Sequence, residues 1–465
     1  MRAWRWTITA LAGVVLVAGA IYLQAAARVG AGYKAKILCS AVFVSGRSPD
    51  AVLAEDLRVD GLELLDLFSH RIDRQQPSVT ISFFGLVEQR AIYRDGLGCT
   101  LVIGRPEQEL RAEAPAFPRA LVLPEARWPD GRRVDSGTAA PDIDTAALER
   151  AVDAAFAEPN RELLQRTRAL IVVHRGGIVA ERYADGFDRH TPMLGWSMTK
   201  SALNALVGIR IRRGKLSPVK RELLPEWRGA GDPRSEITLD HLLRMAGGLA
   251  FSEDYDDRLS DVVTMLFTKG DKAGFAAAKQ LTHTPGHHWS YSSGSSNIIA
   301  RVLRSTFSDR HDYLTFPHRE LFTRLGMEKA VLEPDASGTF TASSFMYATA
   351  RDWARLGLLF LRDGIWQGTR ILPEGWVAAS LRPTRAAPKG DYGAHLWLKL
   401  PPIFGPGEPT LPEDTYYMLG HDGQTVAVVP SVDLVIVRLG LARKPGAWKP
   451  GEILAPIVSA FSPRQ

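Results

Sequence analysis

The segment Leu194-Gly195-Trp196-Ser197-Met198-Thr199-Lys200-Ser201 opens a run that stays apolar on nearly every side until Arg210. A helix with this composition is buried. Ser197 and Lys200 stand at positions i and i+3, so their side chains share one face, one turn apart. Desolvation lowers the pKa of a buried lysine, and a neutral lysine beside a serine hydroxyl creates an activated nucleophile. The segment therefore predicts a catalytic serine, Ser197, with Lys200 as its base.

A second Ser-x-x-Lys motif, Ser217-Pro218-Val219-Lys220, tests how specific the first one is. It lies in a connector that follows Gly214, where Pro218 favours a turn. We interpret Ser217 as a turn or cap residue. For Ser197, the motif alone leaves a helix N-cap with a solvated lysine as the alternative.

The composition excludes several classes of protein. The 465 residues are 45% hydrophobic and 23% charged, with a net charge of +6, which are ordinary globular values. The densest basic run (Arg210, Arg212, Arg213 and Lys215) closes an apolar helix without interleaved aromatics, so we expect no nucleic-acid partner. Gly-rich phosphate motifs are absent, and Pro285-Gly286 breaks the helical spacing of His283 and His287. We therefore expect neither a cofactor nor a metal.

The N-terminus predicts export. Arg2 and Arg5 precede an uncharged stretch, Trp6–Ala27, that is long enough to cross about 30 Å of hydrocarbon. An uncleaved anchor is favoured over a signal peptide, although Ala25-Ala26-Ala27 resembles a cleavage site; a buried globular helix is the third possibility. The chain is then expected on the periplasmic side of the inner membrane, anchored there, or secreted.

Export also bears on the oxidation state expected of the two cysteines, Cys39 and Cys99. In an oxidising compartment they could form one disulfide, and the alternative is a pair of buried free thiols. Two cysteines are too few for a disulfide-dense scaffold or a four-cysteine zinc site.

Three regions follow from the pattern along the chain: residues 1–30 as anchor or signal peptide, 31–135 as an N-terminal extension and linker, and 136–465 as the catalytic domain. In the extension we expect a helix over Ala51–Phe68 and two strands, Ser78–Phe84 and Leu86–Tyr93, around Gly85. A Pro- and Gly-rich stretch from Pro115 to Pro141 is typical of a linker.

The catalytic domain begins and ends with strands. Helical spacing over Thr145–Phe156 is followed by the hairpin pattern Ala169–Val173 and Ile178–Arg182, and the C-terminal end repeats that pattern in Thr425–Val429 and Leu434–Leu439. We predict an α+β fold in which one antiparallel sheet is built from both ends of the domain, flanked by helices, with a mostly helical middle.

Several segments carry a family resemblance. Residues 194–201 resemble the nucleophile motif of the serine β-lactamase and penicillin-binding-protein superfamily, in the branch of class C β-lactamases, esterases and 6-aminohexanoate-dimer (nylon oligomer) hydrolases. Further motifs agree in order, namely Ile237–Met245, Trp289–Asn297 with the family's tyrosine, Met346–Arg355 and Gly420–Gln424. The resemblance covers roughly residues 140–465 and is strongest to the nylon-oligomer-hydrolase branch.

The resemblance implies roles for individual residues. Ser197 would form the acyl-enzyme, and Tyr291 would share the base role with Lys200, whose ammonium would favour the phenolate. The backbone N–H groups of Ser197 and of Gln424, which follows Gly423, would form the oxyanion hole. His421 would orient the tyrosine or contact a substrate carboxylate.

Two departures from the family pattern bear on the substrate. Ser293 stands where β-lactamases usually have asparagine, and His421 replaces their lysine. Both favour a small-molecule or peptide-like amide or ester over a β-lactam. The alternatives are a D-Ala-D-Ala carboxypeptidase, a weak β-lactamase, or a catalytically silent sensor that keeps the fold.

An acidic stretch, Glu253, Asp254, Asp256 and Asp257, lacks the spacing of a calcium loop. We expect it to be a solvated loop at the rim of the cleft.

Overall fold

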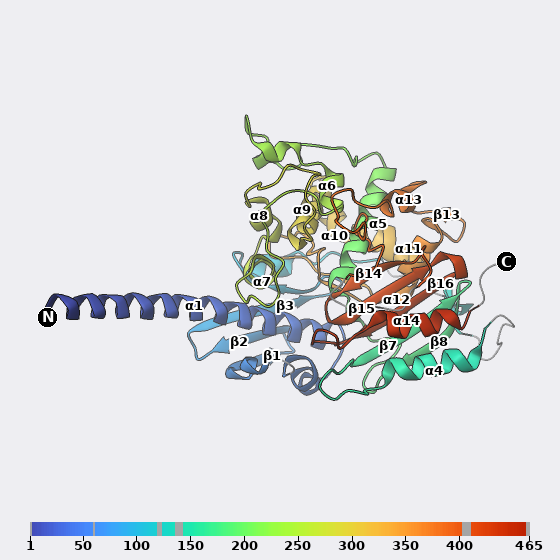
Figure 1. Ribbon diagram of the computed structural model, residues 1–465, viewed down its shortest axis with the longest axis horizontal. Coiled ribbons are helices and arrows are strands. Elements are labelled where there is room, and N and C mark those ends of the chain that lie inside the picture. The colour runs from blue at the N-terminus through green and yellow to red at the C-terminus, as the bar shows by residue number, and fades with distance from the viewer. Residues whose placement is uncertain (1, 59–60, 119–122, 135–142, 402–410, 462–465) are drawn as a thin grey trace.

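One antiparallel sheet organises the catalytic domain (Figure 1). The computed structural model describes residues 2–58, 61–118, 123–134, 143–401 and 411–461, without the side chains of residues 2–12, 123 and 124. The strand order is β14-β15-β16-β7-β8, with bounds β14 (Tyr416–Gly420), β15 (Gln424–Val429), β16 (Leu434–Gly440), β7 (Thr167–His174) and β8 (Gly177–Tyr183). Strand β16 pairs with β7, so both ends of the domain meet in one sheet, as the sequence predicts.

The two faces of this sheet are covered by different helices. Alternate residues of β16 point to opposite faces, so Leu434 and Ile436 pack with α4 (Thr145–Phe156) and α14 (Pro450–Ser459). Val435 and Val437 belong to the larger core on the other face, where α12 (Ala350–Leu361) lies.

The middle of the domain is mostly helical, as predicted, and supplies most of the site. Its helices are α5 (Thr199–Arg212), α6 (Leu239–Leu243), α7 (Asp261–Thr268), α8 (Lys272–Ala277), α9 (Ser293–Arg304), α10 (Arg310–Pro317), α11 (Thr323–Leu325) and α13 (Trp376–Ser380). Short strands link them: β9 (Met193–Leu194), β10 (Val331–Leu332), β11 (Met346–Ala348), β12 (Ile365–Trp366) and β13 (Thr369–Arg370).

The N-terminal region is built around one long helix, α1 (Arg2–Phe43), which projects far from the body at its N-terminal end (Figure 1). Its C-terminal half packs on an antiparallel sheet of β1 (Phe68–Asp73), β2 (Ser78–Phe83), β3 (Val87–Arg94) and β4 (Gly98–Leu101), followed by α3 (Glu107–Ala112). A disulfide joins Cys39 of α1 to Cys99 of β4, the first of the two possibilities that the sequence leaves open. Among the described residues, Gly13–Phe43 is long and apolar enough to cross a membrane.

The helix expected over Ala51–Phe68 is not formed as one element. The chain instead makes α2 (Pro49–Val52), a π-helical turn (Leu53–Leu57) and a 3-10 helix (Glu63–Leu67) before β1 begins at Phe68. Gly61 has a φ of +84°, a left-handed conformation that ends a right-handed helix.

The expected linker also contains regular structure. Strands β5 (Leu123–Arg127) and β6 (Gly131–Arg133) pair within it, and two of its segments, 119–122 and 135–141, lie outside the described residues.

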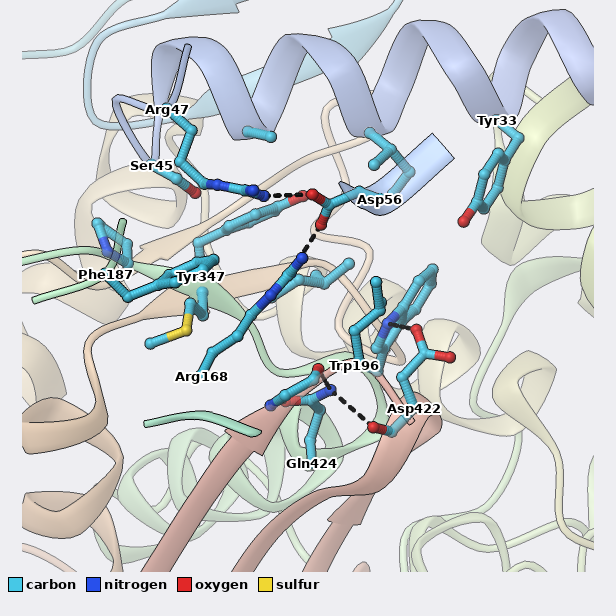
Figure 2. Close-up of a pocket in the computed structure, with 17 residues that line it drawn as sticks. Tyr33, Ser45, Arg47, Asp56, Arg168, Phe187, Trp196, Tyr347, Asp422 and Gln424 are labelled. Atoms are coloured by element: carbon cyan, nitrogen blue, oxygen red, sulfur yellow. Dashed lines mark hydrogen bonds and ion pairs between the residues drawn. The ribbon is translucent and has the colours of Figure 1, made fainter. Parts of the chain in front are cut away.

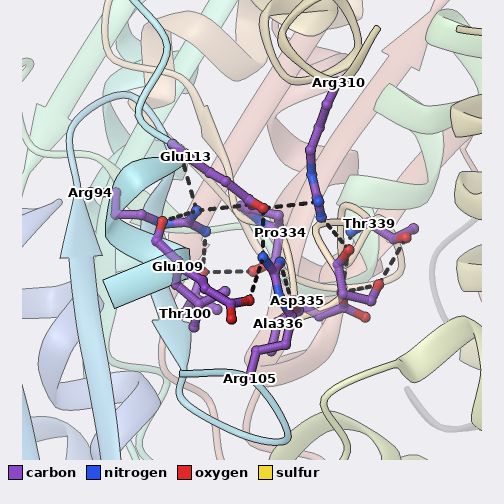
Figure 3. Close-up of polar contacts among 12 residues, drawn as sticks. Arg94, Thr100, Arg105, Glu109, Glu113, Arg310, Pro334, Asp335, Ala336 and Thr339 are labelled. Atoms are coloured by element: carbon purple, nitrogen blue, oxygen red, sulfur yellow. Dashed lines mark hydrogen bonds and ion pairs between the residues drawn. The ribbon is translucent and has the colours of Figure 1, made fainter. Parts of the chain in front are cut away.

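A buried ion pair fastens α1 to the catalytic domain. Lys36 pairs with Glu333, and both side chains are almost fully buried. The Ser40 hydroxyl and the Cys99 N–H donate hydrogen bonds of 2.8 and 2.7 Å to Glu333 Oε1. Nearby, Figure 3 shows Arg105 and Arg310 converging on Glu113, beside the loop that carries Asp335.

Removing one partner of this pair should be costly, because it leaves the other charge buried without compensation. We expect Glu333→Ala to lower the free energy of unfolding by about 3–5 kcal/mol, measured by urea denaturation of the full chain in detergent. The matched control is Glu328→Ala, which removes an exposed ion pair with Arg132 and should cost at most about 1 kcal/mol. Equal losses in the two variants would contradict a stabilising role for the buried pair.

Candidate active site

A tight turn presents Ser197 at the start of α5. Trp196 adopts a left-handed conformation with a φ of +47° just before it. The Gly195 N–H bonds to the Met346 carbonyl at 2.9 Å, which ties the turn to β11. A Cβ on Gly195 would lie 2.2 Å from the Trp353 ring, and one on Gly420 would lie 2.3 Å from the Gly195 carbonyl oxygen. Both glycines therefore permit close packing that holds the turn.

The side chains of Ser197 and Lys200 meet as predicted. Every residue of 195–210 is buried except Ser197, which is half-buried and so remains accessible. Lys200 Nζ lies 3.0 Å from Ser197 Oγ and donates to the Ser343 carbonyl at 3.0 Å and to Ser293 Oγ at 3.2 Å. Asn297, in α9, holds Ser343 by a 3.1 Å hydrogen bond between their side chains.

Burial lowers the pKa of Lys200 to about 8, and the charge of Glu253 opposes this fall. The neutral amine is therefore far more populated at neutral pH than for an ordinary lysine, which is the direction that the sequence predicts. A neutral amine at 3.0 Å can accept the proton of the Ser197 hydroxyl.

Glu253 is not the solvated rim residue that the sequence suggests. Its carboxylate is half-buried and accepts hydrogen bonds from the Ser293 N–H at 2.7 Å and the Ser293 hydroxyl at 2.5 Å. Burial raises the pKa of Glu253, while Lys200 and these hydrogen bonds lower it. Its neighbours Asp254, Asp256 and Asp257 are exposed, as expected. The sequence contains one hint, since aromatic Phe251 and Tyr255 flank Glu253 with the period of an extended, half-buried segment.

Tyr291 also reaches the nucleophile. Its phenol hydrogen-bonds with the Ser197 side chain, and its ring stacks on Trp397 with the centroids 5.5 Å apart. Burial is the largest influence on the Tyr291 phenol and raises its pKa above the ordinary value. The expected lowering of the Tyr291 pKa is therefore wrong in direction. The hydroxyl keeps its proton, because burial destabilises the phenolate more than the hydrogen bond with Ser197 stabilises it.

His421 lies beside the nucleophile turn rather than at the tyrosine. Its ring stacks on Tyr255 at 5.0 Å and meets the edge of Trp196 at 5.6 Å. Burial lowers the pKa of His421, so the imidazole is neutral near neutral pH. Asp422 connects these groups. Its carboxylate accepts a hydrogen bond from Trp196 Nε1 at 3.2 Å (Figure 2). The same carboxylate lies 3.2 Å from His421 Nε2.

The structure does not bring Gln424 and Gly423 into the site. The Gln424 N–H donates to the His421 carbonyl, and the Gln424 side chain is bonded to Gly440 by a 2.6 Å hydrogen bond. A Cβ on Gly423 would meet Arg438 and Trp448, which pack on each other. The reason is the turn at Asp422, whose φ of +60° directs the N–H of Gln424 back toward His421.

The alternative Ser-x-x-Lys motif forms a turn, since the Lys220 N–H bonds to the Ser217 carbonyl at 3.1 Å. Within the described part of the chain, no cluster of three or more His, Cys, Asp or Glu side chains is placed to hold a metal ion. His283 and His288 stack on each other at 3.9 Å.

Comparison with known proteins agrees with this geometry. The sequence profile of the Beta-lactamase family matches residues 152–447. The chain belongs to the Beta-lactamase family. It is similar to the 6-aminohexanoate-dimer hydrolase of Paenarthrobacter ureafaciens, with 28% identity over 59% of this chain and 72% of that protein.

Solved structures share the fold of the family. One from Bacillus anthracis, of the 6-aminohexanoate-dimer hydrolase type, has a TM-score of 0.57 at 20% identity and covers 74% of this chain and 90% of its own. A penicillin-binding-protein homologue from Caulobacter crescentus has a TM-score of 0.53 at 14% identity and covers 68% of this chain and 97% of its own. The protein is thus a hydrolase of the β-lactamase fold.

The electrostatics predict a pH dependence. The neutral fraction of Lys200 grows as pH rises through about 8, so the rate at which a fluorophosphonate labels the protein should rise with it. Because Glu253 raises the pKa of Lys200, Glu253→Gln should move this rise to lower pH. Asp254→Asn, at the exposed neighbouring position, should leave the profile in place. A profile unmoved by Glu253→Gln would show that this carboxylate does not act on Lys200.

Proposed function

We propose that the protein is a membrane-anchored serine hydrolase that cleaves an amide or ester bond through an acyl-enzyme on Ser197. The observation that carries the proposal is the contact between an accessible serine and a buried lysine, at 3.0 Å, where burial lowers the lysine pKa to about 8. An activated nucleophile needs such a base within hydrogen-bond reach.

The acylation step follows from the positions of three groups. Ser197 Oγ attacks the carbonyl carbon while its proton passes to Lys200 Nζ. When the tetrahedral intermediate collapses, the leaving nitrogen or oxygen takes the proton of the Tyr291 hydroxyl. The Lys200 ammonium, 4.8 Å from the centre of the Tyr291 ring, then restores that proton. A phenol that stays protonated suits this donor role.

The oxyanion requires two N–H donors. The first is the Ser197 N–H, which lies in the first turn of a helix and has no intrahelical acceptor. For the second we propose the His421 N–H in place of Gln424. On the edge strand β14, the Tyr417 N–H points outward to the Trp397 carbonyl at 2.8 Å. Every second residue of an extended strand points the same way, so the His421 N–H also faces out. Gly420, just before it, contacts Gly195 of the nucleophile turn.

Deacylation uses the same groups with water. A water molecule attacks the acyl carbon and gives its proton to Lys200 Nζ. When the intermediate collapses, the bond to Ser197 Oγ breaks and the Lys200 ammonium returns that proton to Oγ.

The proposed anchor is supported by the continuity of α1. The exposed apolar residues Val14–Val17 and Ile21–Leu23 belong to the same helix as Cys39, which is disulfide-bonded to the body. Ala27, at the suggested cleavage site, is buried in the fold. Cleavage there would cut a helix that the folded domain uses. The disulfide also suits an oxidising, exported location.

The nucleophile is tested by covalent labelling. We expect a fluorophosphonate probe to label the wild-type chain at Ser197 and not to label Ser197→Ala, with the fold checked by circular dichroism. Lys200→Ala and Tyr291→Phe should each lower kcat/KM for 4-nitrophenyl acetate by about 10²–10⁴-fold, the usual contribution of a general acid or base.

The matched control for the serine is Ser217→Ala, which should keep wild-type labelling and turnover. Failure of the probe to label the wild-type protein, or a mass shift located at Ser217, would overturn the proposal. Stable labelling by a fluorescent penicillin would instead assign the protein to D-Ala-D-Ala carboxypeptidases.

A further inference from the structure

A groove of about 520 Å³ extends along the side of α1 toward the nucleophile turn. Its volume falls within the range of about 300–1,000 Å³ that is typical of small-molecule sites. At one end it is lined by Leu23, Ala26 and Ala27, and at the other by Trp196, Tyr255 and His421. Trp196 directly precedes Ser197, so the inner end of the groove borders the site of the proposed function.

The outer end lies at the level of the proposed bilayer surface. Leu23, Ala26 and Ala27 close the uncharged part of α1, and Arg28, the next residue, is exposed. Tyr33, which lines the groove further in, stands six positions beyond Ala27, or about 9 Å along the helix. The groove therefore spans the short distance between the end of the apolar segment and the nucleophile.

The walls of the groove are apolar. They are formed by side chains of α1, of the segment before β1, of β1, of β2 and of α7, namely Val29, Leu65, Phe68, Phe83, Val263 and Phe267. Phe68 and Phe83 pack together with ring centroids 4.7 Å apart, and Phe83 packs on Phe84 at 4.8 Å. Polar groups gather at the inner end, where Asp256, Arg258 and Arg443 line the groove beside His421.

Exposed apolar side chains lie in the groove lining and directly after Phe83, which lines it. Leu64 and Leu67, which line it, are 55% and 52% exposed. Phe84 and Leu86, at the tip of the β2–β3 hairpin, are 70% and 80% exposed. This sheet lies alongside α1 where the helix leaves the body (Figure 1). Large apolar side chains gathered in one place and left in water mark a surface that contacts a membrane or a partner.

We propose that this groove receives the acyl chain of an amphiphile drawn from the bilayer that holds α1, and presents the ester or amide bond at its head to Ser197. The inference rests on the proposed function and adds the substrate class. An apolar channel that opens at the bilayer and becomes polar at the nucleophile matches a molecule with an apolar tail and a cleavable polar junction. The surrounding bilayer covers the exposed rim.

The first test measures the dependence on chain length. The full chain is reconstituted in vesicles of phosphatidylethanolamine and phosphatidylglycerol, and kcat/KM is measured for 4-nitrophenyl acetate and 4-nitrophenyl decanoate. Each methylene that enters an apolar groove is worth roughly a fourfold gain, so we expect decanoate to exceed acetate by at least tenfold. The double variant Leu64→Glu, Leu67→Glu should reduce this decanoate-to-acetate ratio by at least tenfold.

The matched control is Val219→Glu, which places the same charge at an apolar position that is 75% exposed and lies outside the groove lining. It should keep the wild-type ratio. A ratio near one in the wild-type chain, or a ratio that the Leu64 and Leu67 changes do not alter, would overturn the inference while leaving the hydrolase intact. If the wild-type chain neither reacts with the fluorophosphonate nor hydrolyses 4-nitrophenyl acetate, the proposed function itself is refuted.

The second test identifies the source of the substrate. A 4-methylumbelliferyl hexadecanoate probe is supplied either in the vesicles that contain the protein or in separate vesicles. We expect hydrolysis to be at least tenfold faster when protein and probe share a bilayer. Equal rates would assign the substrate to solution and overturn the membrane source.

Discussion

The burial of Lys200 is the constraint on which the site depends. A charged ammonium in that position is costly, so the folded state shifts its pKa downward and holds the amine by the Ser197 and Ser293 hydroxyls and the Ser343 carbonyl. Glu253 limits the shift by its negative charge, although it does not touch the amine directly but acts across Ser293. Burial therefore makes the Lys200 amine a base, and the surrounding hydrogen bonds hold it where it can accept the proton of the Ser197 hydroxyl.

The N-terminal region and the catalytic domain form one structural unit. Residues of α1, of the first sheet and of the helical middle share a single hydrophobic core. The Lys36–Glu333 pair crosses that boundary, and Tyr33 of α1 contacts Arg443, which lies 3.5 Å from the Asp422 carboxylate. Through Asp422 and Trp196, the N-terminal helix is thus connected by direct contacts to the residue that precedes the nucleophile.

The sequence predicts the main sheet and the Ser197–Lys200 pair well because both depend on local periodicity. The helix Thr145–Phe156 has the predicted bounds for the same reason. The features that the sequence does not predict depend on contacts between segments that are far apart in the chain. Glu253 is half-buried because Ser293, forty positions away, binds it. The Gln424 N–H bonds to the His421 carbonyl instead of facing the nucleophile because Asp422 adopts a left-handed conformation. No pattern of apolar and polar residues specifies that conformation.

The unbroken course of α1 has a mechanical consequence. With no flexible linker between the apolar segment and the folded body, the height and the angle of the nucleophile above the bilayer are both fixed. In the proposed anchored state the enzyme cannot reach outward into the surrounding compartment. It searches in two dimensions, and it meets molecules by lateral diffusion rather than by collision from solution. Such a protein samples a thin layer at the surface, and its encounter rate depends on how crowded that layer is.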